Sequence, residues 1–139
     1  MRNNKEIFKK VLKLLSKKDY SEKEIAEKFP SIPPSILDKL KKEKLIDDSS
    51  LCEKIVNRLK NKGKGYYYIL RELEKRKIRE EIIENFKKEY NFDEEFERCK
   101  KILENFRRKN KKSIILNLKS KGYHEEIIEK LIKEYYPEI

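Results

Sequence analysis

The amino-acid sequence predicts an all-α protein, built as three tandem three-helix repeats that form an elongated, curved helical array. Apolar positions recur along the chain at intervals of 44 to 46 residues, and their local spacing is that of an α-helix. The 139 residues include only three glycines and four prolines, too few to supply the turns of an all-β protein. Charged residues make up 45% of the chain and hydrophobic residues 37%, so we expect each helix to keep one broad face in water.

The first helix of each repeat shows the clearest recurrence. Apolar side chains stand at i, i+3 and i+7, which is one face of a helix. The aligned sets are Phe8, Val11 and Leu15; Cys52, Ile55 and Leu59; and Phe96, Cys99 and Leu103. We therefore expect a helix at each of these sets, and nine helices in all, with three per repeat. Because both cysteines occupy apolar positions of the repeat, we expect them in the core and not in a disulfide or a zinc site.

The second and third helices follow in the same register. The second helices align at Ile25, Ile69 and Ile114 and at Phe29, Leu73 and Leu118; the third helices align at 36–37, 82–83 and 127–128 and at Leu40, Phe86 and Leu131. We place the repeats at residues 1–47, 48–91 and 92–139. Each repeat has too few apolar positions for a secure core of its own, so the three are expected to pack in a row as one continuous domain.

Residues typical of helix ends support the same division. Ser21 followed by Glu24 has the pattern of a capping box. Pro33 and Pro34 suit the start of the third helix, where a missing N–H costs nothing. Gly63 and Gly65 separate the fourth helix from the fifth. Gly122 ends the eighth helix and suits a left-handed backbone conformation.

Several functional classes find no support in the sequence. No stretch approaches the roughly 18 apolar residues of a membrane-spanning helix, and the N-terminus lacks the apolar run of a secretion signal, so we expect a cytoplasmic protein. His124, the only histidine, is interpreted as a solvated first-turn residue. Carboxylate pairs at 47–48, 80–81, 94–95 and 125–126 fall at helix starts, where capping and the helix dipole account for them. We expect no enzyme, no cofactor, no metal site, and a monomer.

Basic residues gather at the junction between the first and second helix of each repeat. The three clusters are Lys17 and Lys18; Lys60, Lys62 and Lys64; and Arg107, Arg108 and Lys109 with Lys111 and Lys112. Charge on a solvated helix face is the usual explanation of a lysine run. With a net charge of +11 and equivalent places in a linear array, the clusters could instead form a ridge that follows a polyanion. Tyr68 lies near Lys64 and, if exposed, could stack on a base or pack against a protein.

Four stretches of the sequence resemble the RecX family. They are Leu12 to Ile25 (LKLLSKKDYSEKEI), Leu45 to Asp48 (LIDD), and Ile55 to Gly63 (IVNRLKNKG) followed by Ile69 to Ile78 (ILRELEKRKI). By this resemblance the paired acids of the family correspond to Asp47 and Asp48, and its arginine on the following helix to Arg58. Its glycine after that helix corresponds to Gly63 or Gly65. The sequence departs from the family at residues 51–53 (LCE), where Phe-Ala is usual, and at residue 77, a lysine where glycine is common.

The resemblance implies a non-enzymatic regulator of the RecA recombinase, acting in DNA recombination, repair and the SOS response. Members of the family bind along the groove of the RecA–single-stranded DNA filament and limit its extension, ATPase and strand exchange. The residues alone leave two alternatives, a general DNA-binding module of helix-turn-helix-like repeats or a scaffold with an incidental positive surface. The residues expected to contact RecA or nucleic acid, with weak binding to DNA alone, are Arg58, Lys60, Lys62, Lys64, Tyr68, Arg107, Arg108, Lys109, Lys111 and Lys112.

Overall fold

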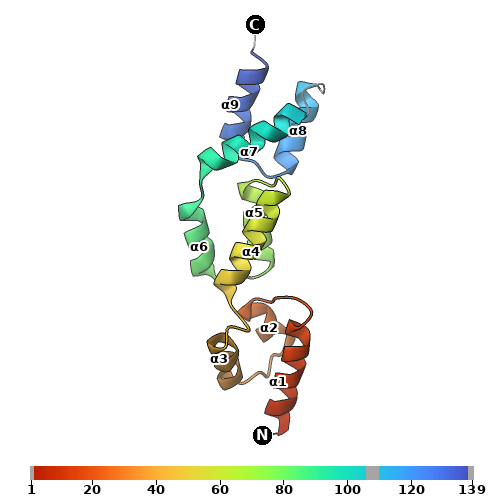
Figure 1. The fold of residues 1–139 in the computed structure, drawn as a ribbon, viewed down its shortest axis with the longest axis vertical. Helices are drawn as coiled ribbons and strands as arrows, with labels where there is room; N and C mark the ends of the chain where they lie inside the picture. The colour runs from red at the N-terminus through yellow and green to blue at the C-terminus, as the bar shows by residue number, and fades with distance from the viewer. Residues whose placement is uncertain (1, 106–109, 138–139) are drawn as a thin grey trace. The chain divides into compact units, whose positions relative to one another are not determined.

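The structure, a computed structural model, describes residues 2–105 and 110–137, and within these ranges it contains nine α-helices and no strand (Figure 1). The helices are α1 (Arg2–Leu15), α2 (Glu22–Lys28), α3 (Pro34–Lys42), α4 (Asp48–Asn61), α5 (Tyr66–Lys75), α6 (Glu80–Glu89), α7 (Phe92–Asn105), α8 (Lys111–Ser120) and α9 (Glu125–Tyr135). The all-α prediction is confirmed. Helices α1, α4 and α7 have 14 residues each and the others are shorter, which is consistent with three helices per repeat.

The chain forms two compact units, and three helices run through both. Unit 1 comprises Met1–Lys54 and Leu73–Asn85, and unit 2 comprises Ile55–Glu72 and Phe86–Ile139. Helices α4, α5 and α6 therefore each contribute residues to both units. The repeat boundaries at 47/48 and 91/92, and the elongated, curved array, stay predictions.

Each unit has its own apolar core, made largely from the side chains that the spacing selects; Tyr20, Ile46, Tyr123 and Ile132 are core residues outside that pattern. In unit 1 one core cluster consists of Val11, Tyr20, Ile25, Ile36, Leu40 and Ile46. In unit 2, where α7, α8 and α9 pack together (Figure 1), it is Cys99, Leu103, Ile114, Leu118, Tyr123, Ile127, Ile128, Leu131 and Ile132. Burial of each such aliphatic side chain stabilises the fold by about 1.5–3 kcal/mol.

Both cysteines lie in the core and neither forms a disulfide, as the repeat predicts. Cys52 is 7% exposed and Cys99 has no exposed surface. Burial raises the pKa of both thiols, that of Cys99 to about 12. A thiol with so high a pKa is almost entirely protonated at neutral pH, so Cys99 is suited to packing and not to nucleophilic chemistry.

Four helices end in the same left-handed turn. The second residue after the last helical residue has a positive φ at Gly63 (79°) and Gly122 (82°), and also at Lys44 (59°) and Lys77 (56°). In each case the next amide bonds back to the helix, in the pairs Leu45–Leu40, Lys64–Leu59, Ile78–Leu73 and Tyr123–Leu118. This is the Schellman motif, which favours glycine because other residues are strained there. The glycine common in the family at position 77 therefore matches a real backbone requirement.

The predicted starts of α2 and α3 are also confirmed. Ser21 Oγ accepts a hydrogen bond from the Glu24 N–H at 3.2 Å, and Glu24 Oε1 accepts from the Ser21 N–H at 2.8 Å, which completes the capping box. Pro34 is the first residue of α3. None of the helices in the described part of the chain is long and apolar enough to cross a bilayer.

Candidate nucleic-acid and partner interface

The junction between α4 and α5 carries two positive side chains that form no hydrogen bond or ion pair within the described part of the protein. Arg58, in the last turn of α4, and Lys62, in the following loop, are both exposed. Among the described residues, neither side chain has a hydrogen-bond or ion-pair partner. Two exposed cations four residues apart, with no internal counter-charge, are available to an external anion.

The other two lysines of this cluster contact the protein itself. Lys60 Nζ lies 3.2 Å from Glu94 Oε1 and 5.6 Å from the centre of the Tyr90 ring. Lys64 Nζ lies 4.5 Å from the centre of the Tyr68 ring. Tyr68 is half-buried, and Lys64 covers one face of its ring; its role in binding stays a prediction. Tyr67, which the sequence did not single out, is 43% exposed.

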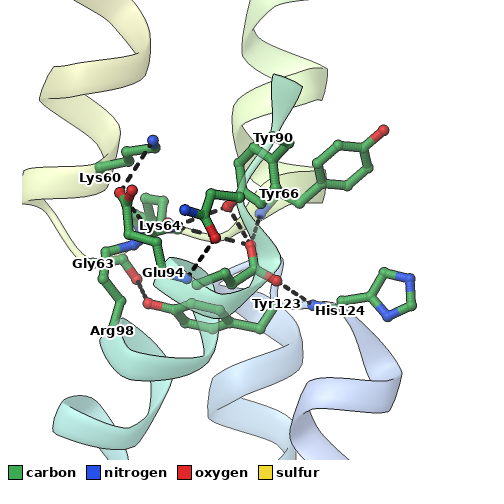
Figure 2. Close-up of polar contacts among 11 residues, drawn as sticks. Lys60, Gly63, Lys64, Tyr66, Tyr90, Glu94, Arg98, Tyr123 and His124 are labelled. Carbon is green, nitrogen blue, oxygen red and sulfur yellow. Dashed lines mark hydrogen bonds and ion pairs between the residues drawn. The ribbon is translucent and has the colours of Figure 1, made fainter. Parts of the chain in front are cut away.

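The loop that carries these lysines is held by hydrogen bonds to its carbonyl and amide groups (Figure 2). The Gly63 carbonyl accepts from the Tyr123 hydroxyl, and the Lys64 carbonyl accepts from Arg98 Nη2 at 3.3 Å. The Gly65 N–H donates to the Lys121 carbonyl at 2.8 Å. Because main-chain groups of the loop are bonded to α7 and to the α8–α9 turn, the positions of Lys62 and Lys64 are fixed by the core of unit 2.

Two glycines permit the loop to approach the α8–α9 turn this closely. A Cβ atom on Gly65 would lie 2.7 Å from the Gly122 carbonyl oxygen, and a Cβ on Gly122 would lie 2.3 Å from the Tyr68 nitrogen. Both distances are shorter than any Cβ contact allows. Gly65, which the sequence predicts only as a separator of two helices, is therefore needed for close backbone packing.

The buried carboxylate of Glu95 connects three helices of unit 2. Glu95 has no exposed surface, and its Oε1 accepts hydrogen bonds from the Tyr66 N–H at 2.6 Å and from the Tyr90 hydroxyl. Its Oε2 accepts from the His124 N–H at 3.0 Å, and Arg98 Nη2 lies 3.9 Å from Oε1. Burial, together with the hydrogen bond to Glu95, raises the pKa of Tyr90. One carboxylate on α7 thus binds the amide groups that begin α5 and α9.

Asp48 plays the same part in unit 1. It is 6% exposed; its Oδ1 accepts from the Glu22 N–H and its Oδ2 from the Arg79 N–H, each at 2.9 Å. The two donors are the repeat counterparts of Tyr66 and His124, since they lie 44 and 45 residues earlier. Helix capping and the dipole of the same helix do not account for Asp48 and Glu95, because these carboxylates bind the starts of other helices.

The dipole explanation does hold for the neighbour of Asp48. Asp47 accepts a hydrogen bond from the Ser50 N–H at 3.1 Å and so caps its own helix. His124 differs from expectation: it is the N-cap of α9 and not a first-turn residue, and its Nδ1 accepts from the Glu126 N–H at 3.3 Å. Its ring stacks on Tyr67, with 5.6 Å between ring centres, and points away from Arg98 and Tyr123 in Figure 2. The described residues contain no group of three His, Cys, Asp or Glu side chains that could hold a metal ion.

The third basic cluster is only partly described. Arg107, Arg108 and Lys109 lie outside the described residues. Lys111 and Lys112 form the first turn of α8, with Lys111 half-buried and Lys112 exposed. Both belong to unit 2, as does the α4–α5 cluster, whereas Lys17 and Lys18 belong to unit 1. A continuous basic ridge over the three clusters stays a prediction.

Comparison with known proteins identifies the family. No family model matches the chain. The protein named Regulatory protein RecX of Clostridioides difficile (strain 630) is 33% identical over 139 aligned residues, covering 90% of this chain and 66% of that protein. This chain belongs to the RecX family. The Regulatory protein RecX of Geobacillus sp. (strain WCH70) is 29% identical, over 92% of this chain but 53% of the relative. The chain thus spans between about half and two thirds of the length of these RecX relatives.

Solved RecX structures share the fold. The crystal structure of RecX from Lactobacillus salivarius superposes with a TM-score of 0.79 and 22% identity, covering 97% of this chain and 98% of that one. A second structure, of the regulatory protein RecX, gives a TM-score of 0.68 at 22% identity and covers 94% and 71% of the two chains. Among the residues that carried the RecX resemblance, Asp48 binds two helix starts, Gly63 adopts a positive φ, and Arg58 is exposed.

Proposed function

We propose that this RecX-family chain is a non-enzymatic regulator of the RecA recombinase, which binds along the groove of the RecA–single-stranded DNA filament and limits its extension, ATPase and strand exchange. The similar proteins are named regulatory proteins, which supports a regulatory role. The observation that carries the proposal is the α4–α5 junction. Arg58 at the end of α4 and Lys62 in the following loop are exposed and have no hydrogen-bond or ion-pair partner among the described residues, and the loop is bonded to the core of unit 2.

This geometry suits a polyanion that runs past the surface. Cations that bind phosphate act mainly by releasing condensed counterions, and a rigid loop loses little conformational entropy on binding. The net charge of +11 adds long-range attraction to a DNA-bearing filament. Contacts to the RecA protein itself supply the preference for the filament over naked DNA.

The test is RecA ATPase on single-stranded DNA, with increasing amounts of the parent protein or of the double variant Arg58→Glu/Lys62→Glu. The parent is expected to inhibit. The double variant should need a concentration at least 10-fold higher, and its log affinity for single-stranded DNA should depend on log salt with a slope shallower by about 1.4, since roughly 0.7 counterions are released per phosphate contact. Exposed charges contribute little to stability, so the helical circular dichroism should not change.

The matched control is Lys88→Glu/Lys101→Glu, which makes the same change of net charge on α6 and α7 at two exposed lysines of unit 2. The control should inhibit nearly as well as the parent. If the two double variants inhibit equally, the junction is not the contact surface. If the parent binds naked single-stranded DNA and the RecA filament equally well at one salt concentration, the general DNA-binding module is the better description.

A further inference from the structure

A shallow hollow next to the basic junction combines an exposed aromatic ring with both signs of charge. It has a volume of about 470 Å³ and lies in unit 2 between the start of α5 and the α8–α9 turn. Tyr67 and Arg71 come from α5, Lys119 from the end of α8, and the start of α9 supplies Glu125 and Glu126.

The aromatic ring of Tyr67 is held in place by neighbouring rings, one of which, His124, also lines the hollow. The ring of His124 stacks against it with 5.6 Å between ring centres and 20° between planes, and Tyr66 meets it edge-on at 5.1 Å. The His124 ring is itself fixed, by the hydrogen bond from the Glu126 N–H and by an edge contact with Phe92 at 5.4 Å. Tyr67 is nevertheless 43% exposed, so it presents a rigid open surface for stacking.

The charges around this ring are balanced. Arg71 and Lys119 are exposed cations, and Glu125 and Glu126 are exposed carboxylates; among the described residues none of these four side chains has a hydrogen-bond or ion-pair partner. A phosphate would be repelled by the two carboxylates as much as it is attracted by the two cations. A neutral planar ligand with donors and acceptors along its edge satisfies both sets.

We propose that the Tyr67 hollow binds a single unpaired base of single-stranded DNA. The base stacks on the Tyr67 ring, while Arg71 and Lys119 donate hydrogen bonds to the acceptors on its edge and Glu125 and Glu126 accept from its amino groups. The phosphates on either side lie towards Arg58 and Lys62, since Tyr67 follows the loop that carries Lys62. Duplex DNA is excluded because its bases are already stacked. The inference rests on the proposed function in one respect only, namely that the DNA passes along the α4–α5 junction.

The experiment measures binding of fluorescently labelled 12-nucleotide strands by anisotropy, with no RecA present. One strand carries a base at every position. The other strand has an abasic site at every position, so it keeps the same number and spacing of phosphates. The parent should bind the base-bearing strand about 5- to 10-fold more tightly, the lower part of the range for one base stacked on an aromatic side chain. Tyr67→Ala should bind both strands alike, and Tyr67→Phe, which keeps the ring, should preserve the difference.

Three results would overturn the inference. The first is that the parent binds both strands with equal affinity, and the second is that Tyr67→Ala lowers the affinity for both strands by the same factor. The third is that the Tyr67→Ala protein binds DNA normally but inhibits RecA poorly, which would make the hollow a protein contact. Tyr67→Phe guards against loss of folding as the cause. The two proposals fail separately: a parent that inhibits RecA without discriminating bases refutes the hollow, and one that discriminates bases without affecting RecA refutes the proposed function.

Discussion

Removing the Glu95 carboxylate should destabilise unit 2 more than any surface substitution. In Glu95→Ala, the amides of Tyr66 and His124 and the hydroxyl of Tyr90 lose their acceptor, and Arg98 keeps Glu94 but loses the second carboxylate near its guanidinium. A buried group left without its partner costs about 1–3 kcal/mol, and removing one member of a buried charged network about 3–5 kcal/mol in all. We expect a loss of about 3–5 kcal/mol in the free energy of unfolding.

Amide hydrogen exchange measured by NMR tests this reasoning at the atoms concerned. In Glu95→Ala, protection of the Tyr66 and His124 amides should fall by roughly 100-fold or more, because about 1.4 kcal/mol corresponds to a factor of ten. Asp48→Ala is the matched control: it should release the Glu22 and Arg79 amides in the same way and leave those of Tyr66 and His124 protected.

Glu95→Gln separates the effect of the carboxylate from that of packing. The side-chain volume is kept, but the amide offers one acceptor oxygen and places an NH₂ group against donors. It should lose at least half as much stability as Glu95→Ala. If Glu95→Ala stays within about 1 kcal/mol of the parent in urea unfolding, or protects both amides normally, the carboxylate does not hold these helices and the argument is wrong.

Two further predictions concern unit 1. Lys77→Gly should raise the free energy of unfolding by about 0.5–1 kcal/mol, measured by thermal unfolding. Glycine relieves the strain of the positive φ at residue 77, and this gain outweighs both the flexibility that glycine adds to the unfolded chain and the loss of the surface ion pair between Lys77 and Glu27. A lower melting temperature would contradict this. Arg76→Ala should cost about 1–2 kcal/mol at pH 7, since burial alone would raise the pKa of Glu24 but the hydrogen bond and charge of Arg76 lower it below 4.5. The stability conferred by a carboxylate with a lowered pKa is lost on acidification, so the difference between parent and variant in urea unfolding should be full above pH 4.5 and shrink below it; a constant difference down to pH 3 would contradict the pairing.

The helices and their ends could be predicted because they depend on local sequence. The i, i+3, i+7 spacing requires only that one face be buried, and the Ser21–Glu24 capping box needs four consecutive residues. The same local logic did not find the positive φ of Lys44 and Lys77, because lysine gives no signal for that conformation. At Lys77 the only signal was the departure from the family's glycine.

The roles of Asp48 and Glu95 could not be predicted, because each depends on partners distant in the sequence. A carboxylate in the first turn is explained well enough by its own helix, so nothing pointed to an amide 29 residues away. Alignment of the repeats also concealed the likeness, since it pairs Asp48 with Phe92 and Glu95 with Leu51. The longer Glu side chain, one turn further along its helix, reaches the equivalent place.

The candidate site was predicted in part. Charge recurrence selected Lys60, Lys62 and Lys64 and the family resemblance selected Arg58; the structure leaves Arg58 and Lys62 exposed, and their role in binding stays a prediction. Sequence could not tell which tyrosine of 66–68 is exposed, because three consecutive helical positions point in three directions and the side of α5 that is buried depends on the α8–α9 turn.

The hydrogen bonds that hold the α4–α5 loop also determine when, during synthesis, the loop can reach its final position. The Tyr123 hydroxyl and the Gly63 carbonyl are 60 residues apart in the chain. At about 5–20 residues per second, the basic loop leaves the ribosome roughly 3–12 s before the tyrosine that fixes it. The lysines are therefore made early and positioned late, and a nascent chain halted before residue 123 carries them on a loop without this bond.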